Sequence, residues 1–307
     1  MWVYLRRRLL LTIPTLLGVS ALTFSMIHLA PGDPVAIMLG GEFAASGRDM
    51  GRLRAELGLD QPVPVQFARY LARAARGDLG ASIRSRRPVA AEIRDRFPPT
   101  FELTVAAMAV AVSAGVLTGT IAATARSPAV DSATMGVALL GLSMPTFWSG
   151  LLLILLFSLK LGWLPITATG LRALILPAVT LAMPAGAVLA RMTRSSLLEV
   201  LDQDYVRTAR ATGVAERLVI FRHALKNAFI PILTIIALQF GGLLAGAVIV
   251  ESVFARPGLG RLAVNAILSR DFPLMQGIVL FTAVIYVFVN LIVDCSYAVL
   301  DPRIRYQ

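Results

Sequence analysis

The stretch DYVRTARATGVAERLVIFRHALKNAFIP, residues 204–231, is a polar, arginine-rich insert between two long apolar runs. Gly213 lies in its middle and suits the left-handed position that follows many helices. We therefore expect two short helices, Tyr205–Thr212 and a second one after the glycine, in which Glu216 takes the third position. The second helix carries an apolar stripe at helical spacing. The stripe consists of Val214, Leu218, Phe221 and Leu225.

The composition of the 307 residues is typical of a membrane protein. Hydrophobic residues make up 57% of the chain and charged residues only 15%. The formal net charge of +11 would indicate a nucleic-acid partner in a soluble protein. No aromatic-basic pattern accompanies it here, so it indicates cytoplasmic anchoring and contact with anionic lipid, and no nucleic-acid partner.

Several kinds of chemical site are not expected. Cys295 is the single cysteine and the two histidines, His28 and His223, lie far apart, so we expect no metal site. No serine–histidine pair is credible, which argues against an intramembrane enzyme and leaves no catalytic residue. Neither Lys160 nor Lys226 follows a glycine, so the chain has no Walker A sequence.

Six segments are long and apolar enough to cross a bilayer, which takes about 20 residues. We therefore expect an all-α membrane protein. The spans are Leu9–Leu29, Phe101–Ala125, Ser132–Leu159, Leu174–Ala190, Phe229–Phe254 and Gly277–Val299. The last five form a core over residues 101–299, and the first is expected to be retained rather than cleaved as a signal peptide.

The arginines predict the orientation of these spans. Those at Arg6–Arg8, at Arg126, between residues 191 and 226, and at the C-terminus all fall on one side. That side is cytoplasmic by the positive-inside rule, so residues 1–8 and 300–307 are expected inside. Residues 30–100 then form an outer loop, whose arginines do not count because it exceeds about 60 residues.

The outer loop reads as amphipathic rather than disordered. Apolar residues recur at helical spacing at Val65, Phe67, Tyr70 and Leu71. Gly77 and Gly80 are expected to break the helical structure after them. Two interpretations stay open. The loop either contacts an extracytoplasmic protein or packs as a structural cap on the helices.

Small residues follow one side of the second span. They are Ala107, Ala111, Gly115 and Gly119, and the fifth span adds Gly242 and Gly246. Such stripes let helix backbones approach closely in lipid. The stripe predicts either packing within the chain or dimerisation with a homologous subunit.

Pro145 lies near the middle of the third span and is expected to kink it. The spans hold few ionisable groups, which argues against a proton- or sodium-coupled secondary transporter. Residues that combine polarity or kinking with mid- to outer-span positions are candidates for lining a translocation pathway. They are Pro145, Phe147, Trp148, Gln239, Glu251 and Asn290.

Two pieces of the insert resemble a known motif. Arg207-Thr-Ala-Arg-Ala-Thr-Gly213 and Arg222-His-Ala-Leu-Lys-Asn-Ala228 are similar to the EAA loop of binding-protein-dependent ABC import permeases. The match is narrower to the B-type permease of the dipeptide/oligopeptide/nickel family, and it spans the chain in order. The other matching segments are Pro31–Pro34, Leu57–Pro62, Gly77–Gly80, Glu251–Phe254, Pro257–Gly260 and Asp301–Tyr306.

Two further segments, Arg86–Val89 and Leu161–Pro165, look similar to the glutathione and dipeptide branch. The chain departs from the general EAA consensus at two places. Arg207-Thr208-Ala209 stands where a glutamate and two alanines are expected, and His223–Lys226 replaces Ile-x-Leu-Pro. Both departures resemble the peptide branch and leave the docking role intact.

The resemblance implies a six-helix type I importer subunit of the inner membrane that moves di- or oligopeptides, glutathione or, alternatively, nickel or another small solute. It implies a heterodimer with a second permease, two cytoplasmic ATPases that bind ATP and magnesium, and an extracytoplasmic solute-binding protein. This chain itself would hold no cofactor. Coupling to the ATPase would fall to the loop 192–228, at Tyr205, Arg207, Thr208, Ala209, Arg210, Ala211, Thr212, Gly213 and Glu216.

Overall fold

The computed structural model describes residues 2–29, 51, 60–166 and 170–300. Within these ranges the chain is helical, and its extended pairing is limited to one isolated bridge between Ala81 and Pro88. The predicted all-α fold is confirmed for this part of the chain. The segments Pro31–Pro34 and Asp301–Tyr306, and residues 57–59 of Leu57–Pro62, lie outside the described residues.

The described residues form two compact units. The first takes residues from Met1–Pro98 and Arg261–Leu291, and the second from Pro99–Gly260 and Ile292–Gln307. Three helices cross the boundary between them: α5 (Val89–Thr124), α12 (Leu259–Leu268) and α13 (Phe272–Leu300).

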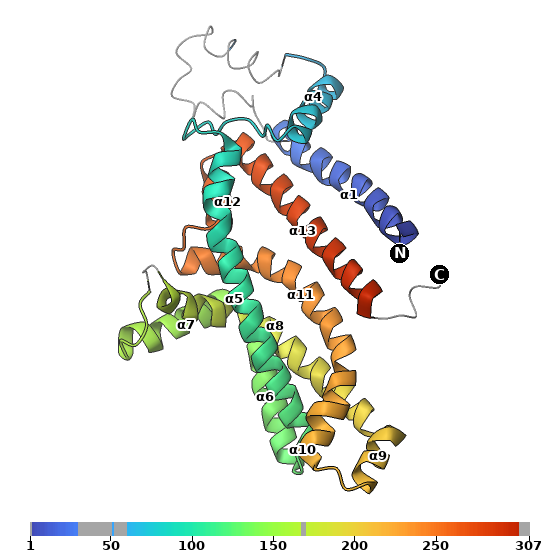
Figure 1. Cartoon of the computed structure of the whole chain (residues 1–307). Coiled ribbons are helices and arrows are strands. Elements are labelled where there is room, and N and C mark those ends of the chain that lie inside the picture. The colour runs from blue at the N-terminus through green and yellow to red at the C-terminus, as the bar shows by residue number, and fades with distance from the viewer. Residues whose placement is uncertain (1, 30–50, 52–59, 167–169, 301–307) are drawn as a thin grey trace. The chain divides into compact units, whose positions relative to one another are not determined.

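In the first unit, α4 (Val63–Ala75) lies against α1 (Trp2–Leu29) (Figure 1), and aromatic rings join the two helices. The ring of Phe24 lies 5.3 Å from that of Phe67 and 5.9 Å from that of Tyr70. Burial raises the pKa of Tyr70 to about 12. The predicted amphipathic helix is therefore confirmed, and the predicted breaks after it are the left-handed glycines Gly77 and Gly80.

In the second unit, α8 (Leu171–Leu201) is the central helix. It packs against α6 (Pro128–Ser143), α7 (Thr146–Leu153) and α11 (Leu225–Val253). Its buried side chains, among them Leu181 and Leu189, join Ile232 and Ala247 of α11 in one apolar core.

The small residues of α5 pack on α8. A Cβ added to Gly115 would lie 2.7 Å from Leu189 Cβ and 2.8 Å from Gly186 O, and one added to Gly119 would overlap the Ala190 carbonyl. Ala107 and Ala111 on the same side are fully buried. Packing within the chain is therefore confirmed for the α5 residues of the stripe, whereas Gly242 of α11 has no other part of the described chain within 4 Å of an added Cβ.

Five helices of the described residues are long and apolar enough to span a membrane. They are Leu10–Leu29, Val89–Thr124, Leu171–Leu201, Glu216–Val253 and Phe272–Ile292. A bent pair, Pro128–Ser143 with Thr146–Lys160, is the sixth candidate if its two parts count as one span. Five to six candidate spans agree with the predicted six-helix class.

The third span corrects one expectation. A single helix with a kink was predicted over Ser132–Leu159, but the chain bends by 106° between α6 and α7, and α7 continues into a π-helix, η1 (Ile154–Lys160). Met144 has ψ of 130°, as steric clash with the following proline ring requires, and this ends α6. Pro145 then sits at the N-cap of α7 with ψ of 133°.

Helix ends also differ from the hydropathy-based limits. α5 begins at Val89 rather than Phe101, and α8 ends at Leu201 rather than Ala190. The first turns of α5 carry charges that are satisfied locally, since Arg87 pairs with Glu92 at 3.4 Å and Asp95 at 2.7 Å. Hydropathy therefore marks only the apolar part of a helix, and α12 was missed altogether.

Candidate functional site

The predicted coupling residues lie between α8 and α11, in a segment we call the helical loop (residues 202–224). After α8 ends at Leu201, Gln203 adopts an extended conformation with ψ of 147°, and α9 (Asp204–Ala211) begins. In Figure 1, α9 lies beside the start of the helix that continues into α11.

The end of α9 is closed by two backbone hydrogen bonds. Gly213 has φ of +80°, and its N–H donates to Arg210 O at 3.1 Å. The N–H of Val214 donates to Ala209 O at 3.2 Å. These bonds form a Schellman motif, so the predicted left-handed role of Gly213 is confirmed.

An ion pair ties the two sides of this turn together. The Arg210 guanidinium donates to both carboxylate oxygens of Glu216, at 2.8 and 3.2 Å. The hydrogen bond to Glu216 raises the pKa of Arg210 above its usual value. Glu216 opens the next helix as its first residue, not its third as predicted, because Ala215 is the N-cap. Its carboxylate therefore binds the preceding helix.

The second helix of the loop differs from the prediction. It is not a separate short helix, because α10 (Glu216–Leu218) and a π-helix, η2 (Val219–Ala224), run directly into α11. Two residues of the predicted apolar stripe lie on the surface, since Leu218 is 50% exposed and Phe221 55% exposed. A π-turn adds a residue to the turn and rotates the buried face.

The side chains that anchor the loop were not predicted. Val206 of α9 and Val219 and Ala224 of η2 are fully buried. Ala224 packs with Leu197 of α8 and Ala228 of α11 in a small apolar cluster.

Two polar contacts add to this anchoring. The Asn227 amide of α11 donates to the Tyr205 hydroxyl at 2.7 Å. Arg194 of α8 binds Asp131 of α6 through two hydrogen bonds of 2.5 and 2.6 Å. The first contact ties α9 to α11, and the second joins α6 to α8, the helix that leads into the loop.

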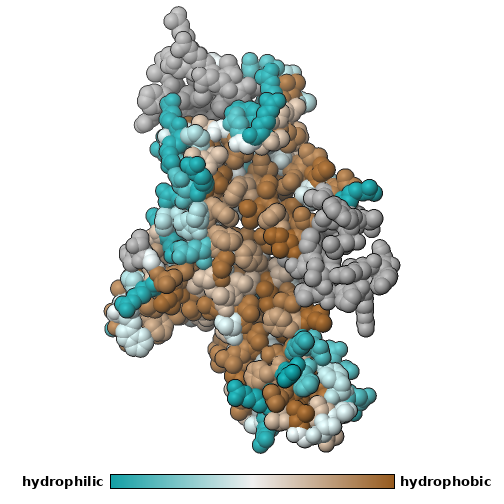
Figure 2. Space-filling view, viewed as in Figure 1, coloured by the Kyte–Doolittle hydropathy of each residue, from teal (hydrophilic) through white to brown (hydrophobic). Residues whose placement is uncertain are grey.

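The outward surface of the loop is polar, cationic and partly apolar. The Arg207 side chain is 67% exposed and lies 3.7 Å from Asp204, and Tyr205 is 42% exposed. The Thr208 and Thr212 hydroxyls donate to carbonyls of α9 itself, at 2.9 and 3.0 Å. Figure 2 shows hydrophilic and apolar side chains mixed at this end of the second unit. The structure thus brings all nine predicted coupling residues together and adds Leu218 and Phe221 to the surface.

The six candidate pathway residues fall in both units, five in the second and Asn290 in the first. Phe147 and Trp148, at the start of α7, are 50% and 47% exposed, and Pro145 beside them is exposed. Gln239 is half-buried on α11, and Asn290 is half-buried on α13, within the first unit. Their role in a pathway stays a prediction.

The sixth candidate, Glu251, is fully buried near the C-terminal end of α11. The Thr100 hydroxyl donates to its carboxylate at 2.5 Å, and the N–H of Leu259 donates to the same hydroxyl at 2.7 Å. A Cβ added to Gly258 would overlap the carboxylate. One added to Gly260 would lie 2.5 Å from Val248 Cα. The motifs Glu251–Phe254 and Pro257–Gly260 therefore form one packed turn.

The apolar helices and the anchored helical loop fit a membrane subunit of an importer. Two family models establish that the protein is of this class. The model described as binding-protein-dependent transport system inner membrane component matches residues 115–306. The N-terminal model of the same kind of component matches residues 1–104. The chain belongs to this family and is a permease subunit of an ABC importer.

Particular relatives refine this result. The chain is 47% identical over 305 residues to the glutathione transport system permease protein GsiC of Escherichia coli strain K12, covering 99% of each chain. The protein of the same name from Salmonella paratyphi A is also 47% identical over 305 residues. The predicted resemblance to the peptide and glutathione branch is therefore confirmed.

Two solved structures share the fold. An inward-facing structure of the MetNI methionine ABC transporter aligns with a TM-score of 0.60 at 15% identity, covering 68% of this chain and 96% of that one. An amino acid ABC transporter crystallised with histidines aligns with a TM-score of 0.51 at 19% identity, covering 69% and 94%. At these identities the likeness shows the fold alone.

Proposed function

We propose that this permease forms half of the translocation pathway of an ATP-driven importer of di- or oligopeptides or glutathione, and that it couples to a separate ATPase through the helical loop. The observation that supports the coupling proposal is that the helical loop is anchored on one side and exposes apolar residues on the other. It is fixed from behind by Val206, Val219 and Ala224, while Leu218 and Phe221 are exposed on its surface. Exposed apolar residues within a polar rim are typical of protein interfaces.

The coupling follows from this rigidity. ATP binding favours one arrangement of an ATPase pair, and a contact that differs between two arrangements shifts the balance of the attached protein. The ion pair between Arg210 and Glu216 and the closed turn at Gly213 keep α9 and α10 in one geometry. A displacement of the loop surface is therefore passed to α11, because α10, η2 and α11 are continuous.

The other partners are inferred from membership of the importer family. A second, homologous permease completes the pathway, two ATPases bind ATP and magnesium, and a solute-binding protein delivers the cargo outside. This chain has no catalytic role of its own. It lies in the inner membrane with both termini in the cytoplasm, and the relation to the glutathione permeases supports the peptide class of cargo.

Site-directed cross-linking tests the docking role. In a Cys295→Ser background, Leu218→Cys is placed on the exposed surface of the loop, and Trp163→Cys, at a position 66% exposed after η1, is the control. With short bifunctional maleimides on native membranes, we expect Leu218→Cys to join to a co-purifying P-loop ATPase and Trp163→Cys not to do so. Equal yields from both positions, or none from Leu218→Cys, would reject docking at this surface.

Uptake assays test the cargo. Vesicles containing the importer are energised with ATP and supplied with its solute-binding protein and labelled glutathione, a labelled dipeptide or labelled nickel ion. We expect ATP-dependent uptake of glutathione or the dipeptide. Uptake of nickel alone would replace the peptide class by the alternative cargo. Uptake without any ATPase subunit would contradict the coupling mechanism.

A further inference from the structure

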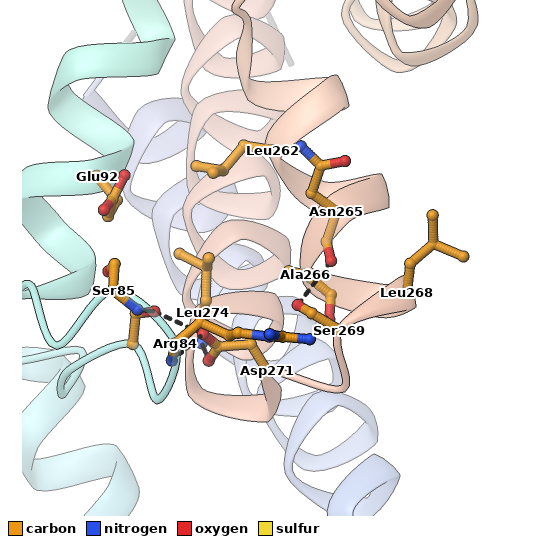
Figure 3. A pocket seen from close by; sticks show the side chains of 11 residues that line it. Arg84, Ser85, Glu92, Leu262, Asn265, Ala266, Leu268, Ser269, Asp271 and Leu274 are labelled. Carbon is orange, nitrogen blue, oxygen red and sulfur yellow. Dashed lines mark hydrogen bonds between the residues drawn. The ribbon is translucent and has the colours of Figure 1, made fainter. Parts of the chain in front are cut away.

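An open cavity of about 420 Å³ lies in the first unit (Figure 3). Its walls come from the segment after Gly80, the start of α5, the C-terminal half of α12 and the start of α13. Cavities of about 300–1,000 Å³ with a few converging polar groups are typical small-ligand sites. None of the sequence motifs accounts for this one.

The frame of the cavity is fixed by Asp271, which is 1% exposed. One carboxylate oxygen accepts hydrogen bonds from the Ser82 hydroxyl at 2.6 Å and from the Arg84 N–H at 3.3 Å. The other accepts the Leu274 N–H at 3.2 Å, which caps α13. Asp271 therefore joins two segments far apart in sequence, and its oxygens are occupied by the protein.

Both segments of the frame contain a strained residue. Arg86 has φ of 60° and Arg270 has φ of 56°, in the left-handed region that residues with a Cβ rarely adopt. Such conformations persist only where the surrounding structure holds them, and they cluster at ligand sites. The walls are thus set before any ligand arrives.

Arg84 is the cationic group of the cavity. In Figure 3 its side chain runs toward Ser269 at the end of α12. Among the described residues its guanidinium has no hydrogen-bond or ion-pair partner, whereas nearby Arg87 is bound to Glu92 and Asp95. The Arg84 N–H donates to Asp271, which fixes the position of the backbone from which the Arg84 side chain extends.

The other lining groups define what Arg84 could hold. The Asn265 amide makes no hydrogen bond with the described part of the chain, and the Ser269 hydroxyl donates to Asn265 O at 2.7 Å, which leaves its oxygen able to accept. Leu262 and Leu274 supply apolar surface. A guanidinium beside an amide and a short apolar wall suits a carboxylate on a small, partly apolar molecule.

We propose that this cavity is a subsite for the free carboxylate of a small peptide, held by the Arg84 guanidinium through two parallel hydrogen bonds. The subsite rests on the proposed function, since it names the group of the peptide cargo that the permease itself recognises. A planar guanidinium matches a carboxylate better than a lysine ammonium does. Arg84→Lys is therefore expected to bind more weakly than wild type and more tightly than Arg84→Gln.

The test uses the purified full chain in lipid nanodiscs, with saturation-transfer NMR titrations of glutathione and of its diethyl ester. Arg84→Gln removes the cation, and Arg76→Gln removes a matched exposed cation at the end of α4, outside the cavity. We expect Arg84→Gln to weaken glutathione binding by about tenfold. Arg76→Gln should bind like wild type, and the ester should bind wild type and Arg84→Gln equally weakly.

Two outcomes overturn the subsite. One is glutathione binding by Arg84→Gln at wild-type strength, and the other is equal binding of the ester and glutathione by wild type. Either result would show that the Arg84 guanidinium does not hold the carboxylate of the peptide.

A second probe separates this proposal from the proposed function. N-acetylalanine carries the carboxylate but has no free peptide amine, and its binding does not depend on transport. Arg84-dependent binding of N-acetylalanine, in vesicles that take up neither glutathione nor a dipeptide, would keep the subsite and remove the peptide-importer function. Peptide uptake together with N-acetylalanine binding that does not depend on Arg84 would keep the peptide-importer function and remove the subsite.

Discussion

Gly213 carries the geometry of the helical loop through its backbone alone. Its φ is +80°, and no atom of another part of the protein lies within 4 Å of the place where a Cβ would be. Any substitution there is penalised by backbone conformation rather than by crowding, at about 1–2 kcal/mol. The residue is therefore a clean test of whether the turn matters for coupling.

We expect Gly213→Val to uncouple ATP hydrolysis from uptake, because the β-branched side chain disfavours the left-handed turn that aligns α9 with α10. The measurement is the ratio of peptide transported to ATP hydrolysed in the reconstituted importer. Gly136→Val is the control, since Gly136 lies within α6 and faces open space. A normal ratio in Gly213→Val would show that the turn is not part of the coupling.

Gly258 is expected to tolerate no side chain. A Cβ there overlaps the buried Glu251 carboxylate, so Gly258→Ala must displace the hydrogen bond from Thr100. We expect a loss of about 1–3 kcal/mol in stability, the usual cost of overpacking. Thermal unfolding of the purified chain measures it, with Gly242→Ala, which meets nothing within 4 Å, as the control. Equal unfolding temperatures for the two variants would contradict this role.

At the level of elements, the break between α6 and α7 has two contributors. Pro145 and the extended Met144 end α6 locally. Gly150 of α7 packs tightly, since an added Cβ would lie 3.2 Å from the Phe254 ring and 3.3 Å from Val253. Packing against α8 and α11 therefore fixes the direction of α7 after the proline has ended α6.

We expect Gly150→Leu to move α7 and Pro145→Ala to leave it in place. Spin labels at Val137 and Leu159, which are 69% and 65% exposed, report the distance across the break in a Cys295→Ser background. Gly150→Leu should shift or broaden the distance distribution, and Pro145→Ala should leave it as in the otherwise unchanged labelled chain. A longer distance in Pro145→Ala alone would assign the bend to the proline.

The sequence predicted those elements whose signals are local. Apolar runs indicated the spans, and the periodicity of Phe67 and Tyr70 indicated α4. Gly213 indicated the end of α9. Each of these signals lies within one turn or one helix, where composition and backbone preference decide the structure.

The features that depend on distant contacts were not predictable. The hydrogen bond between Ser82 and Asp271 joins residues 189 positions apart, and no local sequence pattern predicts it. The π-helix η2 was not predictable either, and from Val219 onward it changes the helical period on which the stripe prediction rested. The six pathway candidates were chosen by type and depth in a span, and these criteria do not specify which helices face one another.

At the scale of the whole molecule, the positive-inside rule makes a prediction of topology. In a Cys295→Ser background, Thr208→Cys and Arg76→Cys carry single exposed thiols on the helical loop and after α4. With both termini inside, a membrane-impermeant maleimide should label Arg76→Cys in intact spheroplasts, and Thr208→Cys only after permeabilisation. The opposite pattern would invert the orientation.

The continuity of the helix from Glu216 to Val253 has a mechanical consequence. Its 38 residues extend about 57 Å, so a tilt of about 5° at one end moves the other by about 5 Å. The far end is clamped, because Glu251, two residues before the end of the helix, is held by Thr100. A force applied at the loop must then bend this lever, and its irregular points are the π-helix η2 and Pro231, which lacks the N–H of a regular helix bond.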